Sequence, residues 1–143
     1  MSAQEVQQAS DRFYQALNKL LNGDSFDMEQ VWSHGPNVST MHPLGGLETD
    51  WEKVWGGWQM ASQAISGGKA EVRDLQVFAL GDVGYTTGVE DAYGIIGGTT
   101  ARFVARCTNI YWKEADGWKI VHHHTDISPE AAEAIQRLMA QQS

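Results

Sequence analysis

The sequence is poor in cysteine and in positive charge. Cys107 is the one cysteine among 143 residues, so no intramolecular disulfide can form and a reducing compartment is expected. Lys and Arg number 10 against 18 Asp and Glu, which gives a formal net charge of −8, and the basic residues form no run. Nucleic acids and anionic membranes bind clustered cations, so neither is an expected partner.

Long apolar runs are missing as well. No stretch approaches the roughly 18 apolar residues of a membrane helix, and the first residues lack the basic and apolar regions of a signal peptide. The apolar fraction of 42% and the charged fraction of 20% are ordinary for a globular protein. The length favours a single domain over residues 1–143, and a cytoplasmic location is the expectation.

Hydrophobic periodicity predicts helices first and long strands afterwards. Apolar residues recur at helical spacing over about 3–22 and about 50–65, with a short helix over 25–32 and a strand over 37–42 between them. Three stretches then alternate with a period of two, followed by a fourth strand that begins at Gly117; these three are 70–80, 83–93 and 99–112. Ser128 followed by Pro129 is typical of the start of a last helix.

This order predicts an α+β fold. Helices that segregate to one face of an antiparallel sheet give that class. We expect a strongly curved, cone-shaped antiparallel sheet closed by the N-terminal helices, with the C-terminal helix added at the end.

The fourth strand carries the most informative pattern. Strand side chains switch sides at every residue, so Trp118, Ile120, His122, His124 and Asp126 are expected on one face. That face begins apolar and ends with two imidazoles and a carboxylate. We interpret it as one wall of a cavity that is apolar at the bottom and carries ionisable side chains near the mouth.

The strand over 37–42 supplies a second wall of this cavity. Its alternation puts His42 on the face of the apolar Val38, and Pro43 ends the strand because proline lacks the N–H that a ladder needs. We therefore predict that His42 and His124 face one cavity and act as general acid and base there, since imidazole titrates near neutral pH. The alternative for His42 is a structural histidine bonded to the backbone.

Metal binding is a weaker interpretation of the same residues. His122, His124 and Asp126, together with His42, have the composition of a two-His-one-carboxylate site, but ligands two apart on a strand are an unspecific signal. Hydrogen bonding between strands explains the same residues. We expect no metal and no other cofactor.

Aromatic residues on the helices are candidate pocket walls. Tyr14, Trp32 and Trp58 suit a flat, partly apolar ligand, while packing of helix faces in the core is the alternative. Cys107 is expected to be a small buried residue.

The strand over 99–112 adds two polar candidates on opposite faces. Arg106 and Asn109 are candidate ligand-binding residues, but the sequence does not decide which of them points inward. If Arg106 points inward, it could pair with Asp126 or with a carboxylate ligand.

Several of these segments, taken together, resemble the nuclear transport factor 2-like superfamily. They are Phe13-Tyr14-x-Ala16-Leu17-Asn18, Gly23-Asp24, Val38-x-x-Met41-His42-Pro43-Leu44-Gly45, Trp58 and Asp116-Gly117-Trp118-x-Ile120-Val121-His122-x-His124. Within it the chain looks like the SnoaL-like, ketosteroid-isomerase-like group and like the association domain of calcium/calmodulin-dependent protein kinase II. The resemblance implies a cone-shaped α+β barrel, a deep pocket and a homodimer.

The resemblance to the steroid isomerase is partial at the catalytic positions. The isomerase has an Asp as general base directly before the Pro of an Asp-Pro-x-Gly turn, and His42 stands at that place before Pro43. Its oxyanion-binding Tyr corresponds to Phe13, with Tyr14 next to it, and its second, protonated Asp has no counterpart. The resemblance therefore does not imply steroid isomerase activity, because one fold hosts many functions.

The sequence thus predicts a soluble protein that binds a small organic molecule in a deep, partly apolar pocket. A proton transfer of the isomerase, cyclase or dehydratase type is the chemistry that such a pocket would suit, and whether the protein is an enzyme stays open. The alternative is a non-catalytic association module like the kinase domain. A second copy of the chain is the expected protein partner.

Overall fold

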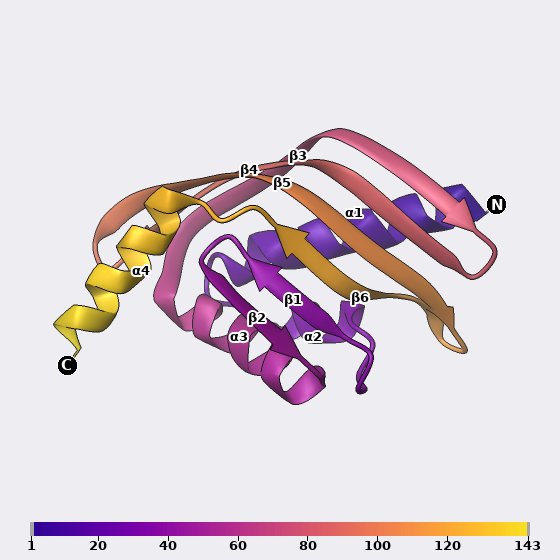
Figure 1. Cartoon of the computed structure of the whole chain (residues 1–143), viewed down its shortest axis with the longest axis horizontal. Helices are drawn as coiled ribbons and strands as arrows, with labels where there is room; N and C mark the ends of the chain where they lie inside the picture. Colours follow the sequence, from indigo (N-terminus) through magenta and orange to yellow (C-terminus); the bar gives the residue numbers. More distant parts are fainter. Residues whose placement is uncertain (1, 143) are drawn as a thin grey trace.

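The computed structural model describes residues 2–142 and has an α+β architecture (Figure 1). In chain order the elements are α1 Ser2–Leu20, α2 Phe26–Val31, β1 Ser39–His42, β2 Gly45–Thr49, α3 Trp51–Ala64, β3 Ile65–Leu80, β4 Val83–Ile96, β5 Thr99–Glu114, β6 Gly117–Thr125 and α4 Pro129–Gln141. The long strands β3, β4 and β5 arch over α1, and α4 lies beside one end of the arch (Figure 1). Among the described residues, no helix is both long and apolar enough to cross a membrane.

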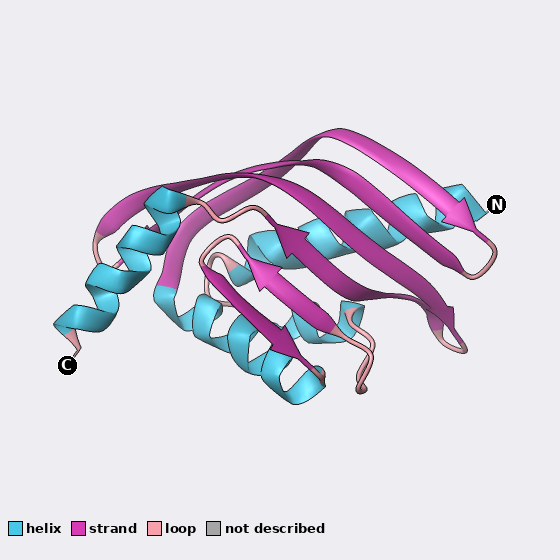
Figure 2. Cartoon of the chain, viewed as in Figure 1, coloured by secondary structure: helices cyan, strands magenta, loops and turns pink. Residues whose placement is uncertain are grey.

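The six strands form one curved sheet in the order β2-β1-β6-β5-β4-β3. Neighbouring strands are antiparallel except for β1 and β6, which run parallel. The helices α1 and α3 lie on the concave side of the sheet (Figure 2). The predicted α+β class, with a curved sheet, N-terminal helices and a C-terminal helix, is confirmed; the sheet is open, because β2 and β3 are edges that do not pair with each other.

The strand β2 was not predicted. Its first residues, Gly45 and Gly46, have positive φ angles of 102° and 85°. The chain reverses before them, at Pro43 and Leu44. Antiparallel pairing of β1 with β2 then places Glu48 opposite Thr40.

The strand β3 begins earlier than predicted, at Ile65, directly after α3. Gly67 and Gly68, which lie between the predicted helix and the predicted strand, are inside this strand. A Cβ on Gly68 would lie 2.8 Å from Leu21 Cβ and 2.8 Å from Tyr93 O. Glycine at position 68 therefore lets the end of α1 pack directly on the sheet.

Two helices begin at side-chain caps. Ser128 Oγ accepts a hydrogen bond from Ala131 N at 3.3 Å, as the sequence predicted for the last helix. For α3, Asp50 is the cap and its carboxylate accepts from Lys53 N at 3.2 Å. The helix therefore begins at Trp51, one residue later than the start predicted from the sequence.

The core lies between the concave face of the sheet and the helices. Its largest fully buried apolar side chains come from every layer and include Phe13, Met28, Trp32, Tyr111 and Ile120. Side chains on the concave face of β4, β5 and β6 thus pack beneath the helices, and a buried site would be built on this face.

Candidate functional site

An irregularity in β6 decides which histidines point inward. Pairing with β5 shifts register so that Ile110 lies opposite His122 and Tyr111 opposite Ile120, and Val121 is the extra residue. Ile120 and Val121 are consequently both buried. A shift of one residue moves the following side chains to the opposite face.

His123 therefore takes the inward position that was predicted for His124. The His123 ring is buried and lies 6.0 Å from the His42 ring between centroids, whereas His124 is exposed on the convex face. The prediction that His42 and His124 share one cavity is wrong. His42 itself is buried on the concave side, as the alternation in its strand predicted.

A continuous group of hydrogen-bonded side chains lines the concave face; we name Tyr14, Glu90, Cys107, Asn109 and His123 the polar cluster. Tyr14 Oη donates to Glu90 Oε2 at 2.8 Å, and Asn109 Nδ2 donates to Tyr14 Oη at 3.2 Å. His123 Nδ1 lies 2.6 Å from Asn109 Oδ1, and Cys107 Sγ lies 3.4 Å from Tyr14 Oη. The cluster thus joins α1 to β4, β5 and β6 through side chains that are all buried.

The face of β5, which the sequence left open, is now settled. Cys107 and Asn109 point inward and are buried, while Arg106 points outward. Arg106 does pair with Asp126, through Nε and Oδ2 at 2.7 Å, but the pair lies on the convex face.

Glu90 is the chemically unusual member of the cluster. Burial raises the pKa of its carboxyl to about 7, and the hydrogen bond from Tyr14 opposes part of that rise. Burial first, and then the neighbouring His42, hold the pKa of His123 well below its usual range. Burial and the nearby Glu90 raise the pKa of Tyr14 and also that of Cys107, the latter to about 12. Within the cluster, Glu90 is therefore the group whose charge changes near neutral pH.

Glu90 and His123 border a small cavity, which we name the inner cavity. Its volume is about 40 Å³, and it is lined by Leu17, Leu21, His42, Pro43, Leu44, Trp58, Glu90, Ala92, Phe103, Ala105 and His123. Space of this size holds a water molecule or a small chemical group, whereas organic ligands occupy pockets of roughly 300–1,000 Å³. The deep pocket expected from the sequence is therefore not shown, and the cone is filled mainly by side chains.

The predicted aromatic residues divide between this cavity and the core. The Trp58 ring borders the cavity and contacts His42 edge-on, with centroids 4.6 Å apart at 85°. Tyr14 belongs to the polar cluster. Trp32 is buried in the core, with its ring centroid 6.2 Å from that of Trp58, and it does not line the cavity.

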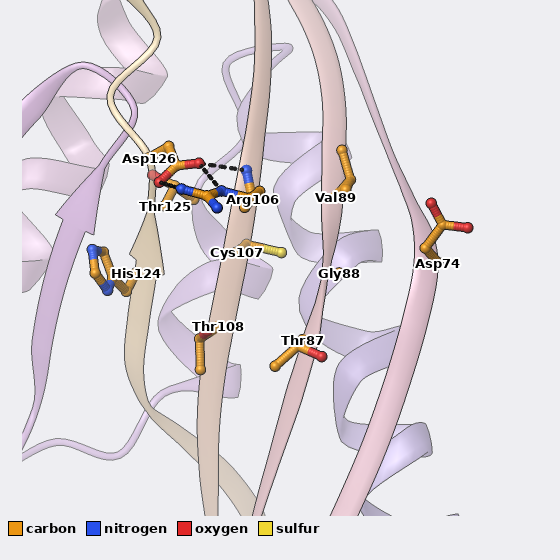
Figure 3. Close-up of a pocket in the computed structure, with 10 residues that line it drawn as sticks. All are labelled: Asp74, Thr87, Gly88, Val89, Arg106, Cys107, Thr108, His124, Thr125 and Asp126. Atoms are coloured by element: carbon orange, nitrogen blue, oxygen red, sulfur yellow. Dashed lines mark hydrogen bonds and ion pairs between the residues drawn. The ribbon is translucent and has the colours of Figure 1, made fainter.

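Four of the predicted site residues lie on the convex face, away from the inner cavity. His124, Arg106 and Asp126 border a shallow groove of about 440 Å³ (Figure 3). The fourth, His122, is half-buried, with Nδ1 2.7 Å from Ser39 Oγ; burial first and then His124 lower its pKa. Within residues 2–142, no three His, Cys, Asp or Glu side chains are placed to hold a metal ion.

Glu90 and His123 were missed as site residues. The signal for Glu90 was a single carboxylate on the face of the strand that also carries Thr86 and Ala92, where an entirely structural strand would be apolar. For His123 the alternation predicted an outward side chain, because the sequence does not reveal that Val121 is an extra residue in the pairing of β6 with β5.

Known structures share this fold. A candidate dehydratase of the NTF2-like family from Streptomyces avermitilis superimposes with a TM-score of 0.77 at 19% identity, covering 88% of this chain and 95% of that one. A candidate ketosteroid isomerase from Shewanella frigidimarina gives a TM-score of 0.66 at 24% identity, covering 83% and 92%. A candidate calcium/calmodulin-dependent protein kinase type II association domain from Thiobacillus denitrificans gives 0.66 at 29% identity, covering 85% and 94%.

The sequence itself matches a family model. Among curated proteins none matches the chain. The model of the SnoaL-like domain matches residues 6–128, which include the whole polar cluster and the residues around the inner cavity. The chain therefore belongs to the SnoaL-like domain family.

Proposed function

We propose that this protein catalyses a proton transfer of the isomerase or dehydratase type on a small, uncharged organic molecule, with Glu90 as the general acid and base. The observation that carries the proposal is the buried Glu90 carboxyl, which borders a cavity without a Lys or Arg among its lining residues in the described part of the chain. A buried carboxyl without a cation is costly to keep, so a structural role alone explains it poorly.

The neighbours of Glu90 suit this chemistry. A general base works best when its pKa lies near the working pH, and burial raises the pKa of Glu90 to about 7. Tyr14 holds Oε2 of this carboxyl at 2.8 Å and so fixes its direction. The imidazole of His42 borders the cavity and, once protonated, can donate a hydrogen bond to an oxygen that becomes negative during the reaction.

The cavity also restricts the substrate. Its lining is apolar apart from Glu90 and the two histidines, which disfavours an anionic substrate because no cation would balance the charge. A ring-sized molecule needs more space than about 40 Å³. The wall of the cavity therefore has to move when such a molecule binds, and we expect the movement at the half-buried residues Pro43 and Leu44. The similarity in fold to a candidate dehydratase and a candidate isomerase supports the reaction class by analogy.

The isomerisation of 3-cyclohexen-1-one to 2-cyclohexen-1-one tests the proposal. A base removes a proton from the carbon between the carbonyl and the double bond, and the same proton returns at the far end of the dienolate, so no cofactor is needed. We expect the wild-type protein to accelerate the appearance of the conjugated ketone in ultraviolet absorbance and Glu90→Gln to lose this. Glu52→Gln, on the exposed side of α3, is the control. Equal rates for folded wild type and folded Glu90→Gln would sink the proposal.

A second candidate function is self-association through the convex face of the sheet. Exposed apolar side chains gather there on three neighbouring strands, namely Phe78, Tyr85, Tyr93, Ile95 and Val104. The Phe78 and Tyr85 rings stack with centroids 4.6 Å apart. Single exposed apolar residues are common, whereas exposed apolar residues grouped on one face of a sheet favour an interface. The 29% identity to the association domain from Thiobacillus denitrificans supports the same role.

Light scattering tests this second candidate. We expect a homodimer, twice the chain mass of 15.8 kDa, at micromolar concentration. Val104→Asp, on the β5 side of the patch, should give the monomer, whereas Glu71→Gln on the edge strand β3 should not. A wild-type monomer at that concentration rules the homodimer out.

A further inference from the structure

His42 is held at the end of β1 beside two polar neighbours. Thr40 and His42 are both buried on the concave side, and β1 changes register against β2 between them. Glu48 lies opposite Thr40 on β2, and its Oε1 accepts a hydrogen bond from Thr40 Oγ1 at 3.1 Å. The same oxygen lies 3.1 Å from His42 Nε2.

This contact is the one polar contact that His42 Nε2 makes in the described part of the chain. The nitrogen is buried and has no well-aligned hydrogen bond, so the Glu48 carboxylate is the charged group that it faces. Burial raises the pKa of Glu48, but His42 and Thr40 more than offset this and hold it below its usual range. Glu48 is therefore ionised at neutral pH.

The helix α3 is shaped to leave room for this contact. A Cβ on Gly57 would lie 2.6 Å from Glu48 Oε1 and 3.4 Å from His42 Nε2, whereas a Cβ on the adjacent Gly56 would meet nothing within 4 Å. Glycine weakens a helix interior, so its presence where the two side chains meet indicates that their approach matters. Glycine at position 57 therefore permits the close approach of Glu48 and His42 to α3.

Glu48 also differs from His42 in its access to water. The Glu48 side chain is 23% exposed, while that of His42 is 8% exposed and borders the inner cavity. The pair therefore extends from the cavity to the protein surface. The other titratable groups that border the cavity beside His42 are His123 from β6 and Glu90 from β4.

We infer that Glu48 is a positioning residue for His42. Its carboxylate keeps the imidazole proton on Nε2 and leaves the lone pair on Nδ1, and it stabilises the imidazolium that forms when His42 accepts a proton. Its exposed side gives that proton a route to solvent. The inference rests on the proposed proton-transfer function, because it gives His42 the task of exchanging protons with the substrate or with Glu90.

Nitrogen-15 NMR of the histidine rings tests this in the full-length protein. In the wild type we expect the neutral His42 ring to carry its proton on Nε2; in Glu48→Ala the proton should move to Nδ1 in a large fraction of the molecules, and Glu48→Asp should restore the wild-type tautomer. Glu52→Ala is the matched control. An unchanged tautomer in folded Glu48→Ala overturns the inference. If Glu48→Ala fails to fold, Glu48→Gln and Thr40→Val apply the same test.

Turnover of 3-cyclohexen-1-one gives a second, independent result. We expect Glu48→Ala to lower kcat by about tenfold, with a smaller change in KM and an altered pH profile, because His42 is misaligned while substrate binding is kept. A rise in KM alone, with kcat and the pH profile unchanged, contradicts a positioning role. If the wild type has no turnover, the proposed function fails, and the tautomer measurement still decides the relationship between Glu48 and His42.

Discussion

Glu90 and His123 face each other across β5, with Glu90 Oε2 3.9 Å from His123 Nδ1, although the strands that carry them are not neighbours in the sheet. Both side chains are buried, and burial favours the neutral form of each. The pKa of the carboxyl is raised to about 7 and the pKa of the imidazole is held well below its usual range, so Glu90 holds a proton in preference to His123. The two groups therefore do not form a fixed ion pair, and Glu90 is the member that takes up and releases a proton near neutral pH.

The raised pKa of Glu90 should make stability depend on pH. Below its ordinary pKa of 4.5 the carboxyl is protonated in both the folded and the unfolded state. As pH rises from there to about 7, the unfolded chain loses the proton first, so the free energy of unfolding should fall by on the order of 3 kcal/mol. Urea unfolding of wild type and Glu90→Gln at several pH values measures this.

The difference between the two proteins isolates Glu90 from other titrating groups, His123 among them. Glu90→Gln should remove the decline between pH 4.5 and about 7 and leave the remaining pH dependence in place. Parallel curves for the two proteins would show that Glu90 ionises normally in the folded state.

Asn109 should contribute strongly to stability, because it connects Tyr14 to His123 inside the core. Asn109→Ala leaves the buried His123 without its hydrogen bond and removes one of the hydrogen bonds to Tyr14, which costs about 2–4 kcal/mol of unfolding free energy. Thr108→Ala, next to it on the convex face of β5, should cost much less. Chemical denaturation of the two variants makes the comparison, and equal losses would argue against the cluster as a stabilising unit.

The two adjacent histidines of β6 should behave differently. His123→Ala removes a buried ring at the inner cavity and should lower turnover of 3-cyclohexen-1-one, whereas His124→Ala removes an exposed ring and should leave it unchanged. Initial rates for the two variants, with folding checked by circular dichroism, decide between them. A loss of rate in His124→Ala alone would restore the assignment made from the sequence.

This contrast shows what sequence periodicity can and cannot predict here. The helical pattern of α1 and the period of two in β3, β4 and β5 are set by which side chains must be buried, and the fold class follows from them. His42 was placed correctly because burial alternates along its short strand up to that residue. His124 was misplaced because one extra residue at Val121 reverses every later side chain in β6.

The rest of the candidate site depends on contacts between distant segments. Tyr14 and Glu90 are 76 positions apart, and their hydrogen bond results from α1 lying across the concave face. Glu48 and His42 meet because β2, which begins with two glycines that read as a turn, pairs with β1. Neither contact leaves a pattern in the local sequence.

The most direct test of the central claim is a titration of the Glu90 carboxyl itself. Carbon-13 NMR of glutamate side chains, assigned by comparison with Glu90→Gln, follows its ionisation in the folded protein. We expect a pKa of about 7, raised from the ordinary 4.5 by burial. A pKa at or below 4.5 would contradict the account, because burial would then not have raised the pKa of Glu90 toward neutral pH, where a general base works best.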